Sequence, residues 1–196
     1  AEMRSALVEE AAAADDELME KYFEEGDLSP EDLSKALRLA IDKLDLYPIL
    51  CSNAKDDMGV ARILEFIVDN VPAPNQVSNA PKTTTGDEIK YDAAAPTLLF
   101  AFKTANEQHL GEVTYLKVMN GEVTESLDLI NANTQGKERV SQILVCAGKN
   151  RQKVEKAVAG DIFCTIKLKD VKTNHSLASA KNSDQMVTPI EFPKPI

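Results

Sequence analysis

The spacing of apolar residues changes from a helical period to a strand period near the middle of the chain. In residues 1–74, apolar side chains recur every three or four positions, as on one face of an α-helix. From Thr97 onward they alternate with their neighbours, as along a β-strand. The two periods belong to different elements, so the sequence predicts two modules, residues 1–74 and 96–196, joined by residues 75–95.

The first module is expected to be helical, with one short strand. Residues 1–26 are rich in Ala and Glu and predict a helix that ends at Gly26. Ser29, followed by a proline, predicts the N-cap of a second helix. Residues 46–51 are an apolar run of strand length, and residues 58–71 predict a third, amphipathic helix. This order indicates an incomplete α/β fold, and we expect it to expose apolar surface where further strands would pack.

The second module is expected to be all-β and to follow a linker. Residues 75–95 show no period and contain Pro, Thr, Asn and Gly, which predicts an interdomain linker. Asn120-Gly121 predicts a hairpin. Along the strand predicted at residues 162–169, Ile162 and its alternates would be buried, whereas Phe163 and its alternates would face water. The predicted strands, separated by turns, indicate a small barrel or sandwich; they cover residues 97–103, 113–119, 138–146, 162–169 and 187–192.

Charge is distributed unevenly between the modules. Residues 1–92 contain 21 acidic and 9 basic residues, a net charge of −12, whereas residues 93–196 contain 11 and 13, a net charge of +2. Only the second module is therefore suited to lie against nucleic acid. No apolar run approaches the ~20 residues that span a bilayer, so a membrane is not an expected partner.

The residues alone predict no catalytic or metal site. The sequence lacks a phosphate loop, an HExxH motif and a nucleophile elbow. Its two histidines, His109 and His175, lie in polar stretches where exposed loop positions are expected. Its three cysteines, Cys51, Cys146 and Cys164, show no metal spacing, and their apolar surroundings predict buried thiols in a reducing cytoplasm.

A short loop in the first module resembles the last guanine-contacting loop of translational GTPases. It is preceded by Ile49-Leu50-Cys51 and followed by Gly59-Val60 and the third predicted helix. In the family this loop normally contains Ser-Ala, and its backbone N–H groups contact the guanine oxygen. Here Asn53 takes the Ser position. The resemblance implies guanine contact by Asn53, Ala54 and Lys55.

The second module resembles domain II of elongation factor G over about 100 residues. The similarity is carried by three segments in the family's order: Gly111-Glu112-Val113 through Val123, Lys137-Glu138-Arg139-Val140, and Ala159-Gly160-Asp161-Ile162. One segment departs from the family, because Thr173-Asn174-His175-Ser176-Leu177 replaces Thr-Gly-Asp-Thr-Leu. The resemblance implies an α+β chain in two modules, the helical tail of a P-loop GTPase domain and then a Greek-key-like β-barrel.

The resemblance also implies a function for a longer parent protein. It would bind GTP and Mg²⁺, bind the ribosome in the cytoplasm and couple GTP hydrolysis to movement of tRNA and mRNA. The chain begins Ala1-Glu2-Met3, as expected of an excised segment, and we expect neither bound cofactor nor catalysis from it alone. Small-subunit ribosomal RNA would meet basic residues of the barrel, the last three of them in a loop; they are Lys137, Arg139, Lys149, Arg151 and Lys153.

Other interpretations of the same residues stay open. These basic residues could form a solvated face, and the barrel could serve as a non-catalytic module that binds protein or RNA. The departure at residues 173–177 also fits a paralogue that acts in ribosomal protection or in release-factor recycling. DNA is not an expected partner under any of these interpretations.

Overall fold

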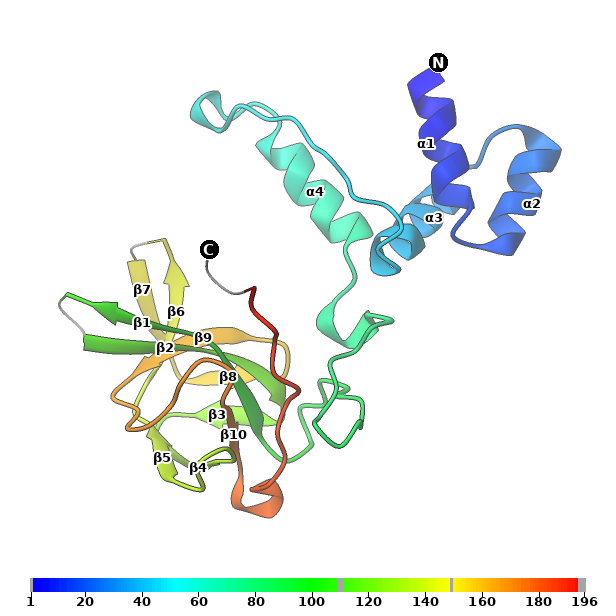
Figure 1. The fold of residues 1–196 in the computed structure, drawn as a ribbon. Helices are drawn as coiled ribbons and strands as arrows, with labels where there is room; N and C mark the ends of the chain where they lie inside the picture. The colour runs from blue at the N-terminus through cyan, green and yellow to red at the C-terminus, as the bar shows by residue number, and fades with distance from the viewer. Residues whose placement is uncertain (1, 109–110, 149, 194–196) are drawn as a thin grey trace. The chain divides into compact units, whose positions relative to one another are not determined.

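A computed structural model describes residues 2–108, 111–148 and 150–193, and the chain divides into two compact units (Figure 1). The division lies between Asn79 and Ala80. We call residues 2–79 the helical unit and residues 80–193 the barrel unit. Residues 80–95, which lie in the segment expected to be a linker, group with the barrel unit, where Ile89 is 1% exposed.

Helices account for the regular structure of the helical unit. They are α1 (Glu2–Ala12), α2 (Asp16–Glu25), α3 (Pro30–Asp42) and α4 (Val60–Asn70), with short 3-10 helices η1 (Ala54–Asp56) and η2 (Pro74–Gln76). The core of the unit is formed by small and aliphatic side chains of α1–α3 and the turn before α3; they are Val8, Ala11, Ala12, Leu18, Leu28 and Ala36. No helix among the described residues is long and apolar enough to cross a membrane.

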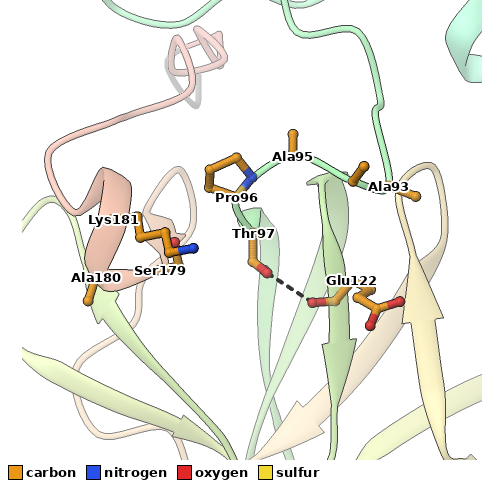
Figure 2. Close-up of a pocket in the computed structure, with 9 residues that line it drawn as sticks. Ala93, Ala95, Pro96, Thr97, Glu122, Ser179, Ala180 and Lys181 are labelled. Atoms are coloured by element: carbon orange, nitrogen blue, oxygen red, sulfur yellow. Dashed lines mark hydrogen bonds between the residues drawn. The ribbon is translucent and has the colours of Figure 1, made fainter.

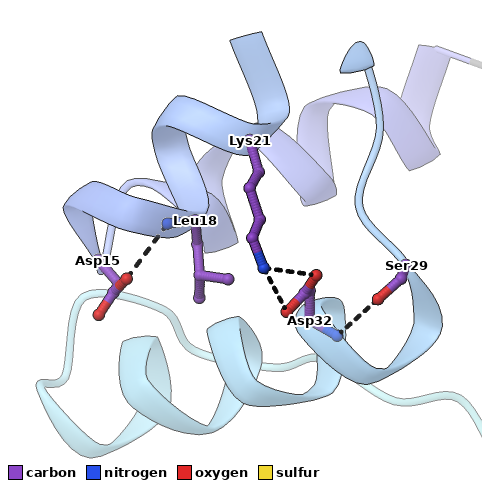
Figure 3. Close-up of polar contacts among 5 residues, drawn as sticks. All are labelled: Asp15, Leu18, Lys21, Ser29 and Asp32. Atoms are coloured by element: carbon purple, nitrogen blue, oxygen red, sulfur yellow. Dashed lines mark hydrogen bonds and ion pairs between the residues drawn. The ribbon is translucent and has the colours of Figure 1, made fainter. Parts of the chain in front are cut away.

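Side-chain caps fix where α2 and α3 begin (Figure 3). Asp15 accepts a hydrogen bond from the backbone N–H of Leu18 at 3.2 Å, which ends the predicted single helix of residues 1–26 and starts α2. The prediction of one continuous helix over residues 1–26 was therefore wrong, because the Asp15 carboxylate caps the start of a second helix. Gly26 ends α2 in the left-handed conformation, and Ser29 caps α3 through the N–H of Asp32 at 3.1 Å, both as predicted.

The predicted strand at residues 46–51 is absent from the structure, where this segment is irregular. Ile49 is 92% exposed. A strand needs a neighbouring strand to pair its N–H and C=O groups, and the described part of the helical unit offers none. The helix predicted at residues 58–71 is confirmed as α4, but Val68 on its apolar face is 77% exposed. The expected exposure of apolar surface is thus confirmed.

A curled antiparallel sheet dominates the barrel unit (Figure 1). Its eight strands are ordered β5-β4-β10-β1-β2-β9-β6-β7, and β3 pairs with β8 in a separate two-stranded sheet. The strands are β1 (Leu98–Glu107), β2 (Gly111–Asn120), β3 (Glu122–Thr124), β4 (Leu127–Asn131), β5 (Lys137–Val140), β6 (Ile143–Ala147), β7 (Asn150–Val154), β8 (Lys156–Val158), β9 (Ile162–Ile166) and β10 (Ser176–Ala178). A 3-10 helix, η3 (Ala180–Asn182), follows β10. The all-β character of the second module is confirmed.

Alternate residues of β1 enter two different hydrophobic clusters. Leu99 and Ala101 belong to the main core, whereas Leu98 and Phe100 pack with Met119 in a second cluster. The central strand β1 is therefore covered on both faces over its first half. The period of two predicted this strand correctly. Its second face is covered by Ile89 and Val187, which belong to the same cluster as Leu98 and Phe100.

Four details of the predicted strands were wrong. The single strand predicted at residues 138–146 is two strands, β5 and β6, which are not neighbours in the sheet. Along β9, Phe163 and Thr165 were expected to face water but are buried, and Ile162 is 54% exposed, because β9 is an interior strand of a curled sheet. Gly121 connects β2 to β3, but β3 pairs with β8, so the chain turns there without forming a hairpin. At residues 187–192 the structure contains only an isolated bridge between Thr83 and Val187.

Candidate functional site

The predicted guanine-contacting loop is a tight turn in the helical unit. The backbone of Asn53 exchanges two hydrogen bonds with Met58, at 2.9 and 3.0 Å, and closes the turn around η1. The Asn53 side chain donates to the Asp56 carboxylate at 2.7 Å and is thus engaged within the turn. Within the described residues, the N–H groups of Ala54 and Lys55 donate no hydrogen bond. The loop therefore presents two free backbone donors, which suit a carbonyl oxygen such as that of guanine.

Glycine is needed where this loop enters α4. Gly59 has φ 79°, and a Cβ atom placed on it would lie 3.1 Å from the backbone oxygen of Cys51. Both observations disfavour any other residue. The glycine in the predicted motif thus shapes the turn between residue 51 and α4.

Two of the predicted RNA-contacting residues, Lys137 and Arg139, lie on β5. Both are exposed, and they alternate with the buried Glu138 and Val140. Arg139 faces Asp128 of β4 across the ladder, with an Nε to Oδ1 distance of 3.8 Å. An exposed ion pair of this kind contributes little to stability, so Arg139 can exchange Asp128 for another partner. Lys137 is likewise exposed and available to a partner.

Glu138 has a structural function that the sequence did not predict. Its carboxylate is buried and accepts the backbone N–H groups of Lys169 and Asp170, at 2.9 Å each. These bonds attach β5 to the loop that follows β9. One feature of the sequence could have revealed this function. Glu138 is an acidic residue on the same face of the predicted strand as the apolar Val140, where a buried side chain is expected.

Arg151 and Lys153, also predicted to contact RNA, lie on β7 rather than in a loop, and both have internal partners. Arg151 forms an ion pair with Glu107, which also accepts a hydrogen bond from the Tyr115 hydroxyl at 3.2 Å. The guanidinium hydrogen bond lowers the pKa of Glu107 below its ordinary value, and the pKa of Arg151 is raised in turn. Lys153 pairs with Glu125 at 2.8 Å. Lys149 lies outside the described residues.

The candidate cations occupy two separate strands. β5 and β7 are the outermost strands in the order of the eight-stranded sheet. Each strand brings its own two cations together, because residues two apart share a face. Strand pairing does not join the pair on β5 to the pair on β7.

The barrel unit contains an open cleft of about 660 Å³ that the sequence did not predict (Figure 2). Its lining comes from three segments, residues 93–97, Glu122 and residues 179–181. The Thr97 hydroxyl donates to the backbone oxygen of Glu122 at 2.9 Å across one wall. The lining side chains are small except for Pro96, Glu122 and Lys181, and the Glu122 carboxylate forms an ion pair with Lys156 at 2.7 Å. No local sequence signal joins segments this far apart.

The histidine and cysteine predictions have mixed outcomes. His175 is half-buried rather than exposed, and its Nδ1 accepts hydrogen bonds from the Asn131 side chain at 3.1 Å and the Lys172 N–H at 3.3 Å. His109 lies outside the described residues.

Of the cysteines, Cys164 is buried, but Cys51 and Cys146 are exposed. Among the described residues, no group of three or more metal-ligating side chains could hold an ion.

Comparison with known proteins identifies the barrel. Residues 96–180 match the family model described as Elongation factor G domain 2. The chain is elongation factor G-like and contains domain II. It is 35% identical over 191 residues to Elongation factor G of Ureaplasma urealyticum serovar 10 and of Ureaplasma parvum serovar 3. The predicted resemblance to elongation factor G is thereby confirmed.

The relatives are much longer than this chain. Each alignment covers 94% of the chain and 28% of the Ureaplasma protein. A crystal structure from Thermus thermophilus shares the fold with a TM-score of 0.70 at 24% identity, and the match covers 98% of this chain and 25% of that one. The elongation factor G domain 2 assignment thus applies to the barrel, and the activity of the whole protein is a separate question.

Proposed function

We propose that this chain is a segment of a cytoplasmic translational GTPase that binds the ribosome and couples GTP hydrolysis to movement of tRNA and mRNA. The observation that carries the proposal is the match of residues 96–180 to elongation factor G domain 2. The identity of 35% to two proteins named Elongation factor G supports it, because that similarity extends over both units.

We propose that Lys137 and Arg139 are the cations of the barrel that contribute most to contact with small-subunit ribosomal RNA. Both are exposed on one face of β5, and only Arg139 has an acidic neighbour, at 3.8 Å. Lysine and arginine bind backbone phosphates and release counterions, which favours association with RNA. Arg151 and Lys153 would have to exchange Glu107 and Glu125 for phosphate, so their contribution is expected to be smaller. Lys149 belongs to the same proposal.

Asn53, Ala54 and Lys55 are proposed to contact the guanine base of GTP. The unpaired N–H groups of Ala54 and Lys55 fit the guanine oxygen, and the closed turn holds them in place. A bound GTP–Mg²⁺ would supply the phosphoryl group whose transfer to water drives the cycle. The phosphate loop and the Mg²⁺ ligands are proposed to lie in an α/β domain that the helical unit completes.

Binding to small ribosomal subunits tests the proposed RNA contact. The 196-residue chain carrying Lys137→Glu and Arg139→Glu would be compared with one carrying Lys82→Glu and Lys90→Glu, two lysines of the same unit outside the proposed contact. Both double variants change the net charge equally. We expect the first to bind at least tenfold more weakly, and the slope of its salt dependence to fall by about 0.7–0.9 for each phosphate that it no longer neutralises. Equal weakening in both variants would contradict a contact at β5.

GTP hydrolysis by the intact parent protein, measured with and without ribosomes, tests the activity. Strong stimulation by ribosomes and competition with elongation factor G are expected. Stimulation without such competition would instead indicate a paralogue in ribosomal protection or release-factor recycling. If the protein bound no nucleotide, the barrel would be a non-catalytic binding module.

A further inference from the structure

Two cysteines that are 18 residues apart in sequence lie in contact within the barrel unit. The Sγ atoms of Cys146 and Cys164 are 3.1 Å apart. Cys146 lies on β6 and Cys164 on β9, and these strands are neighbours in the sheet. A disulfide bond has an S–S distance of about 2.05 Å, so bond formation requires the two sulfurs to approach by about 1 Å.

The surroundings permit this small movement. Among the described residues, β6 pairs with β9 at Leu144 and Cys164 alone, so Cys146 lies beyond the part of β6 that pairs with β9 and is paired instead with Arg151 of β7. The adjacent hairpin of β6 and β7 is therefore attached to β9 at one end only. A hairpin end that is not hydrogen-bonded to the next strand of the sheet can shift relative to that strand more easily than a paired one.

The two thiols differ in their access to solvent. Cys146 is exposed to solvent, whereas Cys164 is buried. Burial, together with the neighbouring Cys146, raises the pKa of Cys164 to about 11. Cys164 thus stays protonated at neutral pH, and Cys146 is the thiol that a dissolved oxidant reaches first.

Arg151 places a positive charge beside both thiols. It lies directly opposite Cys146 in the β6–β7 ladder, and its positive charge partly offsets the rise in the pKa of Cys164. Its Nε atom is buried without a hydrogen-bond partner among the described residues. The thiolate is the reactive form of cysteine, and a neighbouring cation favours it in general.

We propose that Cys146 and Cys164 are a modification site at which a peroxide forms an intramolecular disulfide. The Cys146 thiolate attacks one oxygen of hydrogen peroxide and breaks the O–O bond, giving a sulfenic acid, and the departing hydroxide takes up a proton as water. The Cys164 sulfur then attacks the sulfenic sulfur, the S–O bond breaks, and a second water leaves with the Cys164 proton. Two thiols are oxidised, and one peroxide is reduced to two waters.

The disulfide would fix the β6–β7 hairpin to β9. That hairpin carries Arg151 and Lys153, and Arg151 lies opposite Cys146 in its ladder. Formation of the bond adds a covalent link between β6 and β9 beyond their ladder pair at Leu144 and Cys164. Slower amide exchange in β6 and β7 is therefore the expected physical consequence.

Oxidation of the Cys51→Ser chain by hydrogen peroxide tests the proposal. Cys51 is exposed in the other unit, so its removal leaves both partner thiols intact and prevents competing pairs. We expect a monomer that has lost two hydrogens, a cross-linked peptide containing Cys146 and Cys164 in a non-reducing digest, and amide exchange in β6 and β7 slowed at least fivefold. Thiol reduction should reverse all three changes.

Two matched variants in the Cys51→Ser background complete the test. With Cys164→Ser, Cys146 should accumulate as sulfenic or more oxidised acid, and with Cys146→Ser no modification is expected under the same conditions. The proposal would be overturned if the Cys51→Ser chain itself produced only sulfinic acid or intermolecular dimers. It would also be overturned if both thiols survived a peroxide dose that oxidises Cys146 in the Cys164→Ser variant.

Discussion

Arg151 of β7 forms an ion pair with Glu107 of β1, although β2, β9 and β6 lie between these strands in the sheet order. A side chain can cross this interval only because the sheet curls and brings the end of β1 toward β7. The hydroxyl of Tyr115, on β2, reaches the same carboxylate at 3.2 Å. The ion pair between Arg151 and Glu107 therefore helps to stabilise the curvature of the barrel, in addition to the packing of its core.

Acid should weaken the barrel through Glu107. Hydrogen bonding to Arg151 lowers the pKa of Glu107 below its ordinary value of 4.5, so the pair stabilises the fold above that pH. Its contribution is lost as the pH falls through the lowered pKa of the folded state. We expect the difference in urea midpoint between the parent chain and Glu107→Gln to be largest near pH 7 and to shrink below about pH 4. Glu112→Gln, on the neighbouring strand, is the matched control. A difference for Glu107→Gln that does not change with pH would contradict this origin.

Gly121→Ala should destabilise the barrel strongly. Gly121 has φ 76°, and an added Cβ would lie 2.7 Å from the Thr97 Cα and 2.8 Å from the Ala95 oxygen. Left-handed backbone costs about 1–2 kcal/mol for a residue with a side chain, and overpacking adds about 1–3 kcal/mol. Gly111→Ala is the matched control, because Gly111 has φ 73° but nothing lies within 4 Å of its added Cβ. Urea denaturation followed by circular dichroism should show the larger loss for Gly121→Ala. Equal losses would mean that the close backbone contact has no effect.

Glu138→Ala should loosen the attachment of β5. The buried carboxylate accepts two backbone N–H groups, so its removal deprives both donors, which lie on the exposed residues Lys169 and Asp170, of this partner. A hydrogen bond to a charged group contributes about 1.5–3 kcal/mol when both partners are shielded from water, and less where the donor is exposed as here. Glu138→Gln keeps one acceptor oxygen and should lose less stability, and the exposed Glu155→Ala should change the free energy of unfolding by less than about 0.5 kcal/mol. A Glu138→Ala chain as stable as the Glu155→Ala chain would show that water replaces the carboxylate.

Ser29→Ala should destabilise the helical unit without affecting the barrel. The Ser29 hydroxyl accepts the N–H of Asp32 at 3.1 Å (Figure 3), and loss of an N-cap costs about 0.5–2 kcal/mol. Ser5→Ala, on the exposed face of α1, should have the opposite sign, because Ala favours a helix interior. Amide exchange in α3 separates this effect from global unfolding. Unchanged exchange in α3 of the Ser29→Ala chain would indicate that the cap contributes little.

Local patterns predicted the elements well but placed some of them wrongly. The Ser29-Pro30 start, the stop at Gly26 and the alternation along β1 all depend on residues within a few positions of one another. The strand expected at residues 46–51 failed for the opposite reason. Its apolar run was correctly recognised, but strand formation depends on a partner that this unit does not contain among its described residues.

The sequence supplied the residues of the candidate site but not their arrangement in the structure. Family resemblance placed Lys137 and Arg139 on a strand, as the structure does, but it placed Arg151 and Lys153 in a loop, whereas they lie on β7. No local pattern indicates that Arg151 and Lys153 have carboxylate partners 44 and 28 residues away. Such pairs form when the chain closes on itself, and no local signal encodes which acid will lie beside which base.

By itself, the sequence determined that this protein has a helical unit and an all-β unit related to elongation factor G, because periodicity, caps and family segments are written in neighbouring residues. Only the tertiary structure decided that β3 pairs with β8, that Glu138 anchors a loop and that Cys146 meets Cys164. These contacts join residues far apart in the chain. They are selected by the curl of the sheet and the packing of its core, which are properties of the whole fold.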